Sequence, residues 1–380
     1  MLVVFWGALS LLVYSYFIYP LLLKLLVKPK EIKLQTLNEL PSVDIIIAAY
    51  NEEACIKARI ENALVQNYKG KLNILVASDG SRDKTSEIIT GFTDSRVKAF
   101  VFPENRGKIS VLNDLISQSR ADYLVLTDAN TDFNIDAVDI LIRSFTDKVG
   151  VVSGELVLET EEGNQNQDGL YWKYEQLLKK YESALGGLLG ANGAIYAIKR
   201  ELYIPLSKDT VVDDFCIVMN IKKQGYQVLY NELAIATEEI APSLKEEYGR
   251  RVRIGIGNYK AFMVNLWALS PLQGWFSLCY WSHKVLRWFA PHLMLVVFLS
   301  NLLLITTPVY LLLFIGQVVF YTIGYYGQRK IDSGKKVHGL VAIITFFLSM
   351  NVALAQGFLK FLKGHKSGGW QRTARSGDTK

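Results

Sequence analysis

Four short apolar runs, each followed by a polar turn and a helical pattern, constrain the fold of this chain most. The first is the β-branched run Val43–Ala49, which continues into the turn Tyr50-Asn51-Glu52. A run without turn residues is typical of a strand buried on both faces of a parallel sheet. The other three runs are Leu72–Ala77, Val97–Val101 and Tyr123–Thr127. Strands that alternate with helices predict a doubly wound, mostly parallel α/β sheet.

Acids, amides and a lysine follow the predicted strands at the point where each strand ends. The segments concerned are Ser78–Thr85, Pro103–Lys108 and Asp128-Ala129-Asn130. In open α/β sheets, ligands bind in the crevice beyond the carboxyl ends of the strands. These side chains are therefore candidate nucleotide contacts. For Asp83 a helix cap is an equally good interpretation, because Asp is preferred at that position.

The hydrophobic content indicates a membrane protein. Half of the 380 residues are hydrophobic, which exceeds what one soluble domain needs. The segment Met1–Val27 is apolar, long enough to cross a bilayer, and lacks the charged start and cleavage site of a signal peptide. Four lysines (Lys24, Lys28, Lys30 and Lys33) accompany or follow it, and the positive-inside rule then places the next domain in the cytoplasm.

The predicted organisation therefore alternates membrane and soluble segments. Residues 1–27 form a transmembrane helix and residues 28–41 a linker to an α/β domain over residues 42–253. Aromatic residues mixed with isolated cations predict interfacial helices over residues 254–287. About three transmembrane helices follow in residues 288–362, at Phe289–Thr307, Val309–Tyr326 and His338–Phe361, and residues 363–380 form a basic tail.

The number of membrane crossings stays open at this point. One anchor plus three spans leaves the basic tail outside the cell, against the positive-inside rule. An additional span at Phe262–Trp281 returns the tail to the cytoplasm but exports the cations between Lys284 and Lys336. Charge counting alone does not choose between these two arrangements.

Cysteine usage and net charge exclude several function classes. The three cysteines, Cys55, Cys216 and Cys279, lack the spacing of a zinc site or a disulfide framework. The net charge of +6 is modest, and the basic residues cluster beside apolar segments. That pattern is typical of membrane flanks, so no nucleic-acid partner is expected.

Taken together, four motifs resemble those of inverting family 2 glycosyltransferases of the GT-A fold, in the membrane-anchored polysaccharide-synthase branch. They are Ala49-Tyr50-Asn51-Glu52, Ser78–Thr85, Thr127-Asp128-Ala129-Asn130 and Val211-Val212-Asp213-Asp214. The resemblance implies a multi-pass protein of the cell membrane with a cytoplasmic catalytic domain. It would move a sugar from a nucleotide diphosphate, with UDP expected, to a growing polysaccharide or a lipid-linked glycan. It also implies contacts with membrane lipid and with polysaccharide-export partners.

The same resemblance assigns residues to the donor site. Arg253 matches an arginine that binds the donor diphosphate in the family, and an Arg fork suits phosphate. Asp128 and Asn130 are the expected ligands of a divalent cation, Mg²⁺ or Mn²⁺, because hard cations take oxygen ligands. Helix capping is the competing role for the nearby Asp132. The full predicted donor set is Ala49, Tyr50, Asn51, Glu52, Asp79, Lys108, Asp128, Arg250 and Arg253.

The acceptor side of the predicted site centres on two adjacent acids before a helix. In the family the second of these acids is the general base, which assigns that role to Asp214. A carboxylate within hydrogen-bond reach of a sugar hydroxyl can take its proton. Asp213, Gly193 and Ala194 are expected at the acceptor. A helix cap for Asp213 and a tight turn for Gly193-Ala194 are the structural alternatives.

Several positions depart from the family pattern. Asn130 replaces an acid, Asp213 replaces a glutamate, Arg250 replaces a glutamine and Ile254 replaces a tryptophan. These departures motivate an alternative function, that of a non-catalytic membrane scaffold or subunit that binds a sugar nucleotide. The retained residues Asp128, Asp214 and Arg253 favour the enzyme.

Overall fold

The computed structural model describes residues 1–29, 31–159, 167–239 and 244–364. The chain divides into two compact units. Of the described residues, the sheet unit comprises 28–29, 31–159 and 176–239, and the helical unit comprises 1–27, 167–175 and 244–364. The sequence predicted an α/β domain reaching Arg253, whereas the contacts group residues 244–253 with the helical unit.

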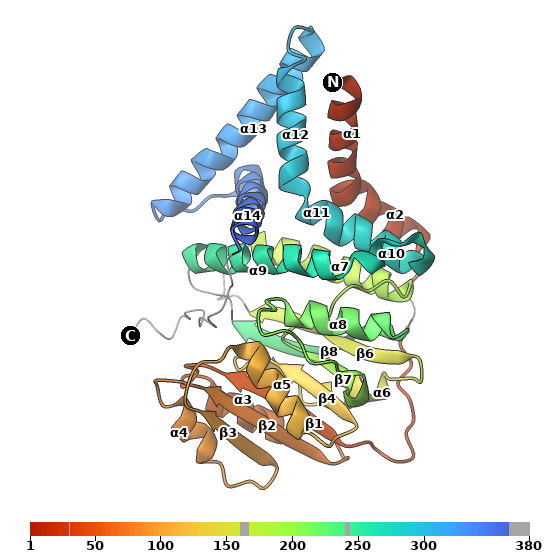
Figure 1. The fold of residues 1–380 in the computed structure, drawn as a ribbon, viewed down its shortest axis with the longest axis vertical. Coiled ribbons are helices and arrows are strands. Elements are labelled where there is room, and N and C mark those ends of the chain that lie inside the picture. The colour runs from red at the N-terminus through yellow and green to blue at the C-terminus, as the bar shows by residue number, and fades with distance from the viewer. Residues whose placement is uncertain (30, 160–166, 240–243, 365–380) are drawn as a thin grey trace. The chain divides into compact units, whose positions relative to one another are not determined.

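An eight-stranded mixed sheet forms the centre of the sheet unit (Figure 1). The strand order is β3-β2-β1-β4-β7-β6-β8-β5. The neighbouring pairs among β1 to β4 are parallel, β6 is parallel to β8, and β7 and β5 are antiparallel to their neighbours. The strands are β1 (Val43–Ala49), β2 (Leu72–Asp79), β3 (Val97–Phe102), β4 (Tyr123–Thr127), β5 (Asp132–Phe133), β6 (Val149–Glu159), β7 (Tyr196–Lys199) and β8 (Gln227–Glu239).

Helices pack on the sheet through their apolar faces. Residues of α5 and α8, including Leu112, Leu115 and Val218, share one core with Ile46 of β1 and Leu75 of β2. All seven residues of β1 are buried, as expected for a strand covered on both faces. The helices are α3 (Ile56–Leu64), α4 (Thr85–Thr90), α5 (Lys108–Gln118), α6 (Ala137–Arg143), α7 (Gln167–Ala184) and α8 (Asp213–Lys223), with the short η2 (Arg200–Leu202).

The predicted α/β architecture is confirmed. Strands β1 and β4 have the predicted bounds, and β2 and β3 each extend one or two residues further. The antiparallel direction of β5 and β7 was not predicted, because β5 has only two residues and strand alternation alone does not set the direction of β7. The polar composition of residues 161–168 predicts a loop, and most of this segment lies outside the described residues.

A close backbone approach at Gly80 joins two of the strand-end loops. Gly80 has φ +66°, and a Cβ there would lie 2.5 Å from the carbonyl carbon of Glu104 and against the nitrogen of Asn105. We expect Gly80→Ala to lower the apparent Tm of the purified protein by several degrees. The left-handed conformation alone costs an L-residue about 1–2 kcal/mol.

Gly91→Ala is the matched control for this substitution. Its backbone has φ −75°, and its Cβ would meet only helical carbonyl oxygens, at 3.4 Å. Differential scanning fluorimetry of both variants tests the prediction. An unchanged Tm for Gly80→Ala would show that the two loops are not held together there.

The helical unit begins with α1 (Leu2–Val13), the π-helical turn η1 (Tyr14–Ile18) and α2 (Tyr19–Leu26). By length and composition, three helical segments of the described chain could span a membrane: Leu2–Leu26, Pro308–Asp332 and Gly339–Leu362. A fourth candidate is the pair Trp275–Trp288 and Ala290–Leu302, which is bent by 63°. The remaining elements are α9 (Leu244–Val264), η3 (Leu266–Leu269), η4 (Pro271–Gln273), α10 (Trp275–Cys279), η5 (Tyr280–Val285), α11 (Leu286–Trp288), α12 (Ala290–Leu302), α13 (Pro308–Asp332) and α14 (Gly339–Leu362).

Candidate active site

The turn after β1 is held to the loop after β2 by side chain to backbone hydrogen bonds. Asn51 has φ 56°, a conformation that Asn tolerates better than most residues. Its Oδ1 accepts a hydrogen bond from the backbone N–H of Arg82 at 2.8 Å. The N–H of Glu52 donates to Thr85 Oγ1 at 2.7 Å. These bonds bring two motifs that are separate in sequence to one edge of the sheet.

Several predicted donor residues at this edge are buried. Ala49 is fully buried in the core, so its side chain offers no surface to a ligand. Glu52 is 6% exposed, whereas Tyr50 and Asn51 keep part of their surface. For Asp83 the capping interpretation is supported, because its Oδ1 accepts a hydrogen bond from the N–H of Thr85, the first residue of α4, at 3.0 Å.

Asp79, the last residue of β2, fixes the turn before α5. Its side chain is fully buried, and its oxygens accept hydrogen bonds from the N–H groups of Arg106 (3.0 Å) and Gly107 (2.8 Å). Gly107 has φ 87°, a conformation that glycine adopts without strain. The next residue is Lys108, the first residue of α5. Asp79 therefore positions the backbone from which the Lys108 side chain extends.

Lys108 joins acids that lie far apart in the sequence. Its ammonium nitrogen is 2.8 Å from Asp128 Oδ1 and 3.2 Å from Asp213 Oδ2. Burial alone would lower the pKa of Lys108, but the carboxylates of Asp128 and Asp213 more than offset it, so its pKa is raised. Lys108 is therefore a permanent cation at this edge. This geometry brings Lys108 and Asp128, both members of the predicted donor set, into direct contact.

Asp214 lies beside this cluster at the start of α8. Its Oδ1 accepts a hydrogen bond from the N–H of Phe215 at 2.8 Å, and a Cβ on Gly193 would lie 3.4 Å from its Oδ2. Loss of hydration and repulsion by Asp213 raise the pKa of Asp214 to about 6. Asp214 is only partly buried, so a ligand can reach it. A carboxylate with this pKa is ionised at pH 7 and is a stronger base than an ordinary Asp.

The turn that carries Gly193 brings small residues next to the acid. The N–H of Ile195 donates to the carbonyl of Asn192 at 2.9 Å, and the N–H of Asn192 donates to Ser153 Oγ at 3.0 Å. Ala194 is buried in the core. The tight-turn interpretation of this segment is therefore correct, and Gly193 also lies directly against Asp214.

The candidate cation ligands offer two kinds of oxygen. Asp128 has 39% of its side chain exposed, and Asn130 two residues later is also partly exposed. Within the described residues no group of three or more His, Cys, Asp or Glu side chains forms a metal cluster. A carboxylate with an amide oxygen nevertheless fits a hard cation whose remaining ligands come from phosphate and water.

Two residues outside the predicted set, Arg59 and Asn62, brace the segment after Asp128. Asn62 of α3 donates to the carbonyl of Phe133 at 2.9 Å and accepts from its N–H at 3.0 Å. The fully buried guanidinium of Arg59 lies 4.2 Å from the centroid of the Phe133 ring. The signal was present, since Arg59 occupies the apolar face of a helix between Ile56 and Ile60.

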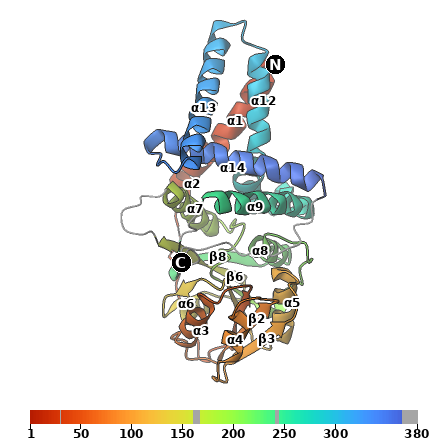
Figure 2. The same ribbon diagram turned by 90° about the vertical axis from the view of Figure 1, so that its left-hand side faces the viewer.

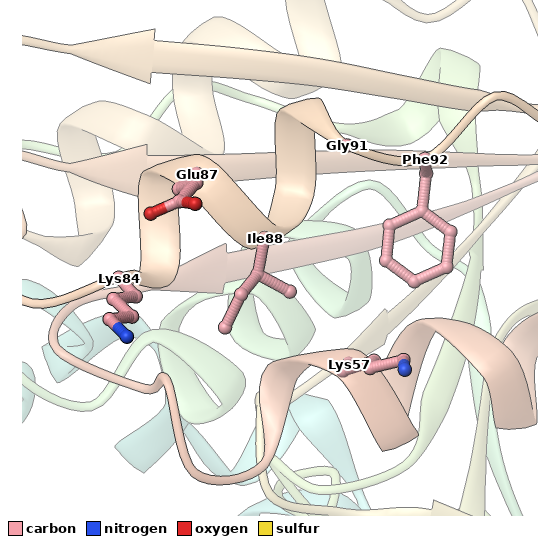
Figure 3. A pocket seen from close by; sticks show the side chains of 6 residues that line it. All are labelled: Lys57, Lys84, Glu87, Ile88, Gly91 and Phe92. Atoms are coloured by element: carbon pink, nitrogen blue, oxygen red, sulfur yellow. The ribbon is translucent and has the colours of Figure 1, made fainter.

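Arg250 and Arg253 are on α9, which belongs to the helical unit, so their predicted role at the donor stays a prediction. Figure 3 shows a shallow hollow of about 310 Å³ between α3 and α4. Its lining shares no residue with the predicted site and consists of Lys57, Lys84, Glu87, Ile88, Gly91 and Phe92.

Residues 44–203 match the family model "Glycosyl transferase family 2", and residues 172–323 match "Glycosyl transferase family group 2". The poly-beta-1,6-N-acetyl-D-glucosamine synthase of Staphylococcus aureus is 26% identical over 234 residues, 60% of this chain and 57% of that protein. The Staphylococcus epidermidis synthase is 24% identical over 238 residues, with 60% and 58% covered. The chain therefore matches somewhat more than half the length of these relatives.

A solved structure extends the likeness to nearly the whole chain. The mannosyltransferase PcManGT from Pyrobaculum calidifontis, in complex with GDP-Man and Mn²⁺, has a TM-score of 0.70 and 19% sequence identity. The match covers 93% of this chain and 97% of that protein. At this identity the likeness concerns the fold.

Proposed function

The chain carries a family 2 glycosyltransferase domain of the GT-A fold, and we propose that it transfers a sugar from a nucleoside diphosphate donor to a growing polysaccharide. The observation that carries this proposal is the cluster at the sheet edge. A permanent cation, Lys108, lies between Asp128 and Asp213, and a base with a raised pKa, Asp214, lies beside them. Glycosyl transfer needs both a cation for the leaving diphosphate and a base for the acceptor.

Each residue of the cluster has a role in the proposed reaction. Asp214 takes the proton of the acceptor hydroxyl as its oxygen forms a bond to the anomeric carbon. The bond between that carbon and the phosphate oxygen breaks, and the nucleoside diphosphate leaves from the opposite face. Lys108 neutralises charge on the departing diphosphate. Asp79 keeps Lys108 in place through the N–H groups of the preceding turn.

We assign Asp128 and Asn130 to a divalent cation, Mg²⁺ or Mn²⁺. When bound, the cation would supply positive charge to the diphosphate oxygens. The protein ligands of the cation are one carboxylate and one amide, so the protein contributes only one negative charge. The diphosphate supplies the remaining negative charge. The cation is therefore expected to bind together with the nucleotide.

Removal of divalent cations is expected to weaken UDP binding at least about tenfold, which is ~1.4 kcal/mol. Isothermal titration calorimetry with EDTA-treated protein, before and after addition of Mn²⁺, measures this change. Asp128→Ala should bind UDP equally weakly with and without Mn²⁺. An Asp128→Ala variant that keeps the full Mn²⁺ effect would show that the cation binds elsewhere.

The donor and the product are testable in one experiment. The Staphylococcus relatives are named as poly-N-acetylglucosamine synthases, which makes UDP-N-acetylglucosamine the first donor to test. Membranes that contain the protein would be supplied with UDP-N-acetylglucosamine, UDP-glucose or GDP-mannose, and the products analysed by mass spectrometry. We expect transfer from a UDP-sugar. Nucleotide binding without transfer to any acceptor would instead favour the non-catalytic scaffold.

A lipid-linked glycan is the second candidate acceptor, and the polar residues of the membrane helices favour it. A hydrated polymer needs polar groups facing a cavity. Asn301 and Asn351 are 1% and 3% exposed, and Asn351 donates to the carbonyl of Phe347 within its own helix. A long insoluble product from the purified enzyme supports the polysaccharide, whereas one sugar per lipid supports the lipid acceptor.

A further inference from the structure

The helical unit has two ends of different charge, defined by the packing of α1 against α12. Phe5, Ala8 and Val297 form a small core with Leu293 and Leu304 around it. Near the start of α1, Trp6 Nε1 donates to the hydroxyl of Tyr310 at 3.1 Å. Near its end, the Tyr14 hydroxyl is 2.8 Å from Ser282 Oγ. The helices α1 and α12 are therefore antiparallel, and Met1 lies at the same end as the turn at residues 303–307.

Charged residues occur only at the opposite end. Residues 1–23 and 290–328 contain no Lys, Arg, Asp or Glu. The cations flanking these segments are Lys24, Lys28, Lys284, Arg287, Arg329 and Lys330. The positive-inside rule places that end in the cytoplasm. Helix α13 has 25 residues, about 37 Å at 1.5 Å per residue, enough to return from the outer face to the cytoplasm.

The axis of helix α14 has a different direction from the axes of α12 and α13. Figure 2 shows α14 lengthwise, lying across the direction of α12 and α13, and Figure 1 shows it end-on. Helix α14 meets α13 where the Phe320 and Phe347 rings lie 6.1 Å apart. There Gly324 faces Leu348 and Gly327 faces Thr345. Length and composition alone qualify α14 as a span, but its direction does not.

Helix α14 instead packs against α9, with contacts that follow in the same order along both helices. The guanidinium of Arg251 lies 4.9 Å from the Phe346 ring centroid, and the Tyr259 and Phe358 rings are 4.9 Å apart. Between them, Gly255 packs against Gly357. Helix α9 carries Arg250, Arg251, Arg253 and Lys260, and four cations in the hydrocarbon core are too costly. Helix α9 therefore lies at the membrane surface, and so does α14, which packs against it.

We infer that α14 lies in the plane of the cytoplasmic membrane face and that the chain crosses the bilayer three times, through α1–α2, through the apolar residues 289–307 that contain α12, and through α13. One face of α14, with Ala342, Ala353 and Gly357, is buried against protein. The exposed apolar side chains of this helix are Leu340, Ile343, Val352, Leu359 and Leu362, each between 49% and 69% exposed. Phospholipid acyl chains of the inner leaflet cover them.

The charges at the two ends of α14 are consistent with a helix that lies against phospholipid. Lys335 and Lys336 precede the helix, and Lys360 and Lys363 lie at its end. Cations at both ends of an apolar, in-plane helix pair with anionic lipid headgroups. With three crossings the basic tail is cytoplasmic, and every cation flanking the membrane helices is on the same side. This arrangement removes the conflict that charge counting left, because the last apolar helix need not cross.

Cysteine labelling of the full chain tests the topology. Single cysteines Thr306→Cys, Ser333→Cys and Ser376→Cys would be placed in a variant without Cys55, Cys216 and Cys279. We expect a membrane-impermeant maleimide to label Thr306→Cys in intact cells. The other two should be labelled only after permeabilisation. Labelling of Ser333→Cys or Ser376→Cys in intact cells, or none at Thr306→Cys, would overturn the inference.

Fusions after Lys380 provide a measurement that needs no substitution. We expect a green fluorescent protein fusion to fluoresce and an alkaline phosphatase fusion to be inactive, because each reporter works on only one side of the membrane. An active phosphatase with a dark fluorescent protein means that α14 crosses. The outcome is independent of glycosyl transfer, so failure of the proposed function and failure of this topology are distinguishable.

Discussion

The Asp214→Asn variant is expected to lose about 10²–10⁴-fold in kcat, the range that a general base contributes, while UDP affinity changes little. Asn keeps an oxygen that can accept the hydrogen bond from the N–H of Phe215, but it cannot take a proton from the acceptor. Radiolabelled sugar transfer measures kcat, and calorimetry measures UDP affinity. A variant with full activity would exclude Asp214 as the base.

The pH profile provides a second readout of the same residue. The pKa of Asp214 is raised to about 6, and only the ionised form accepts a proton. We expect the rate of the unsubstituted enzyme to fall about tenfold per pH unit below pH 6, since a single group is being protonated. The residual activity of Asp214→Asn should lack this acidic limb. If Asp214→Asn kept the same acidic limb, the limb would reflect the titration of another group.

Unfolding does not account for the expected loss in this variant. A raised carboxylate pKa means that the folded state disfavours the ionised form above pH 6. Replacement by a neutral amide is therefore expected to leave Tm at pH 7.5 unchanged or higher. Asp94→Asn is the matched control, since Asp94 is paired with Arg96 at the surface, 2.8 Å away. It should leave both kcat and the pH profile unchanged.

The second large effect is expected for Lys108→Met, with a decrease in kcat/KM of about 10²–10³-fold, as for loss of one preorganised electrostatic donor. The variant removes the cation that lies between Asp128 and Asp213. It also leaves those two carboxylates facing a diphosphate without that positive charge. UDP affinity should fall as well, in contrast to Asp214→Asn.

Lys98→Met supplies the control for Lys108→Met, because Lys98 is exposed on β3 and loses the same charge. Comparison of the two variants by sugar-transfer kinetics and calorimetry separates a local effect from a change in net charge. If Lys108→Met retained the kcat/KM of Lys98→Met, the cluster would have no part in catalysis.

Local sequence patterns were sufficient for the elements and for most site candidates. Strand β1 was predictable residue by residue because an uninterrupted β-branched run has few other ways to bury its side chains. The polar residues after each strand were identifiable because parallel strands end at one edge. Asp79, Lys108 and Asp128 became candidates in this way, whereas Asp214 was assigned by the resemblance to the family.

Contacts between distant segments were not predictable from those patterns. The ion pairs of Lys108 depend on three strand or helix termini meeting in space, and no local rule sets their distances. Arg59 and Asn62 were missed because their partner, Phe133, is about seventy positions away in the chain. Asp79 was assigned to the nucleotide, whereas its oxygens also hold the turn before Lys108.

For the membrane-associated helices too, some features were predictable from the sequence and others only from the folded structure. Hydropathy and the position of lysines were enough to identify the apolar helices, because a run of apolar residues is expelled from water in any context. They could not distinguish a helix that crosses the bilayer from one that lies in its surface, because both have the same composition. The direction of α14 follows from its packing along the charged helix α9, and that contact exists only once the chain has folded.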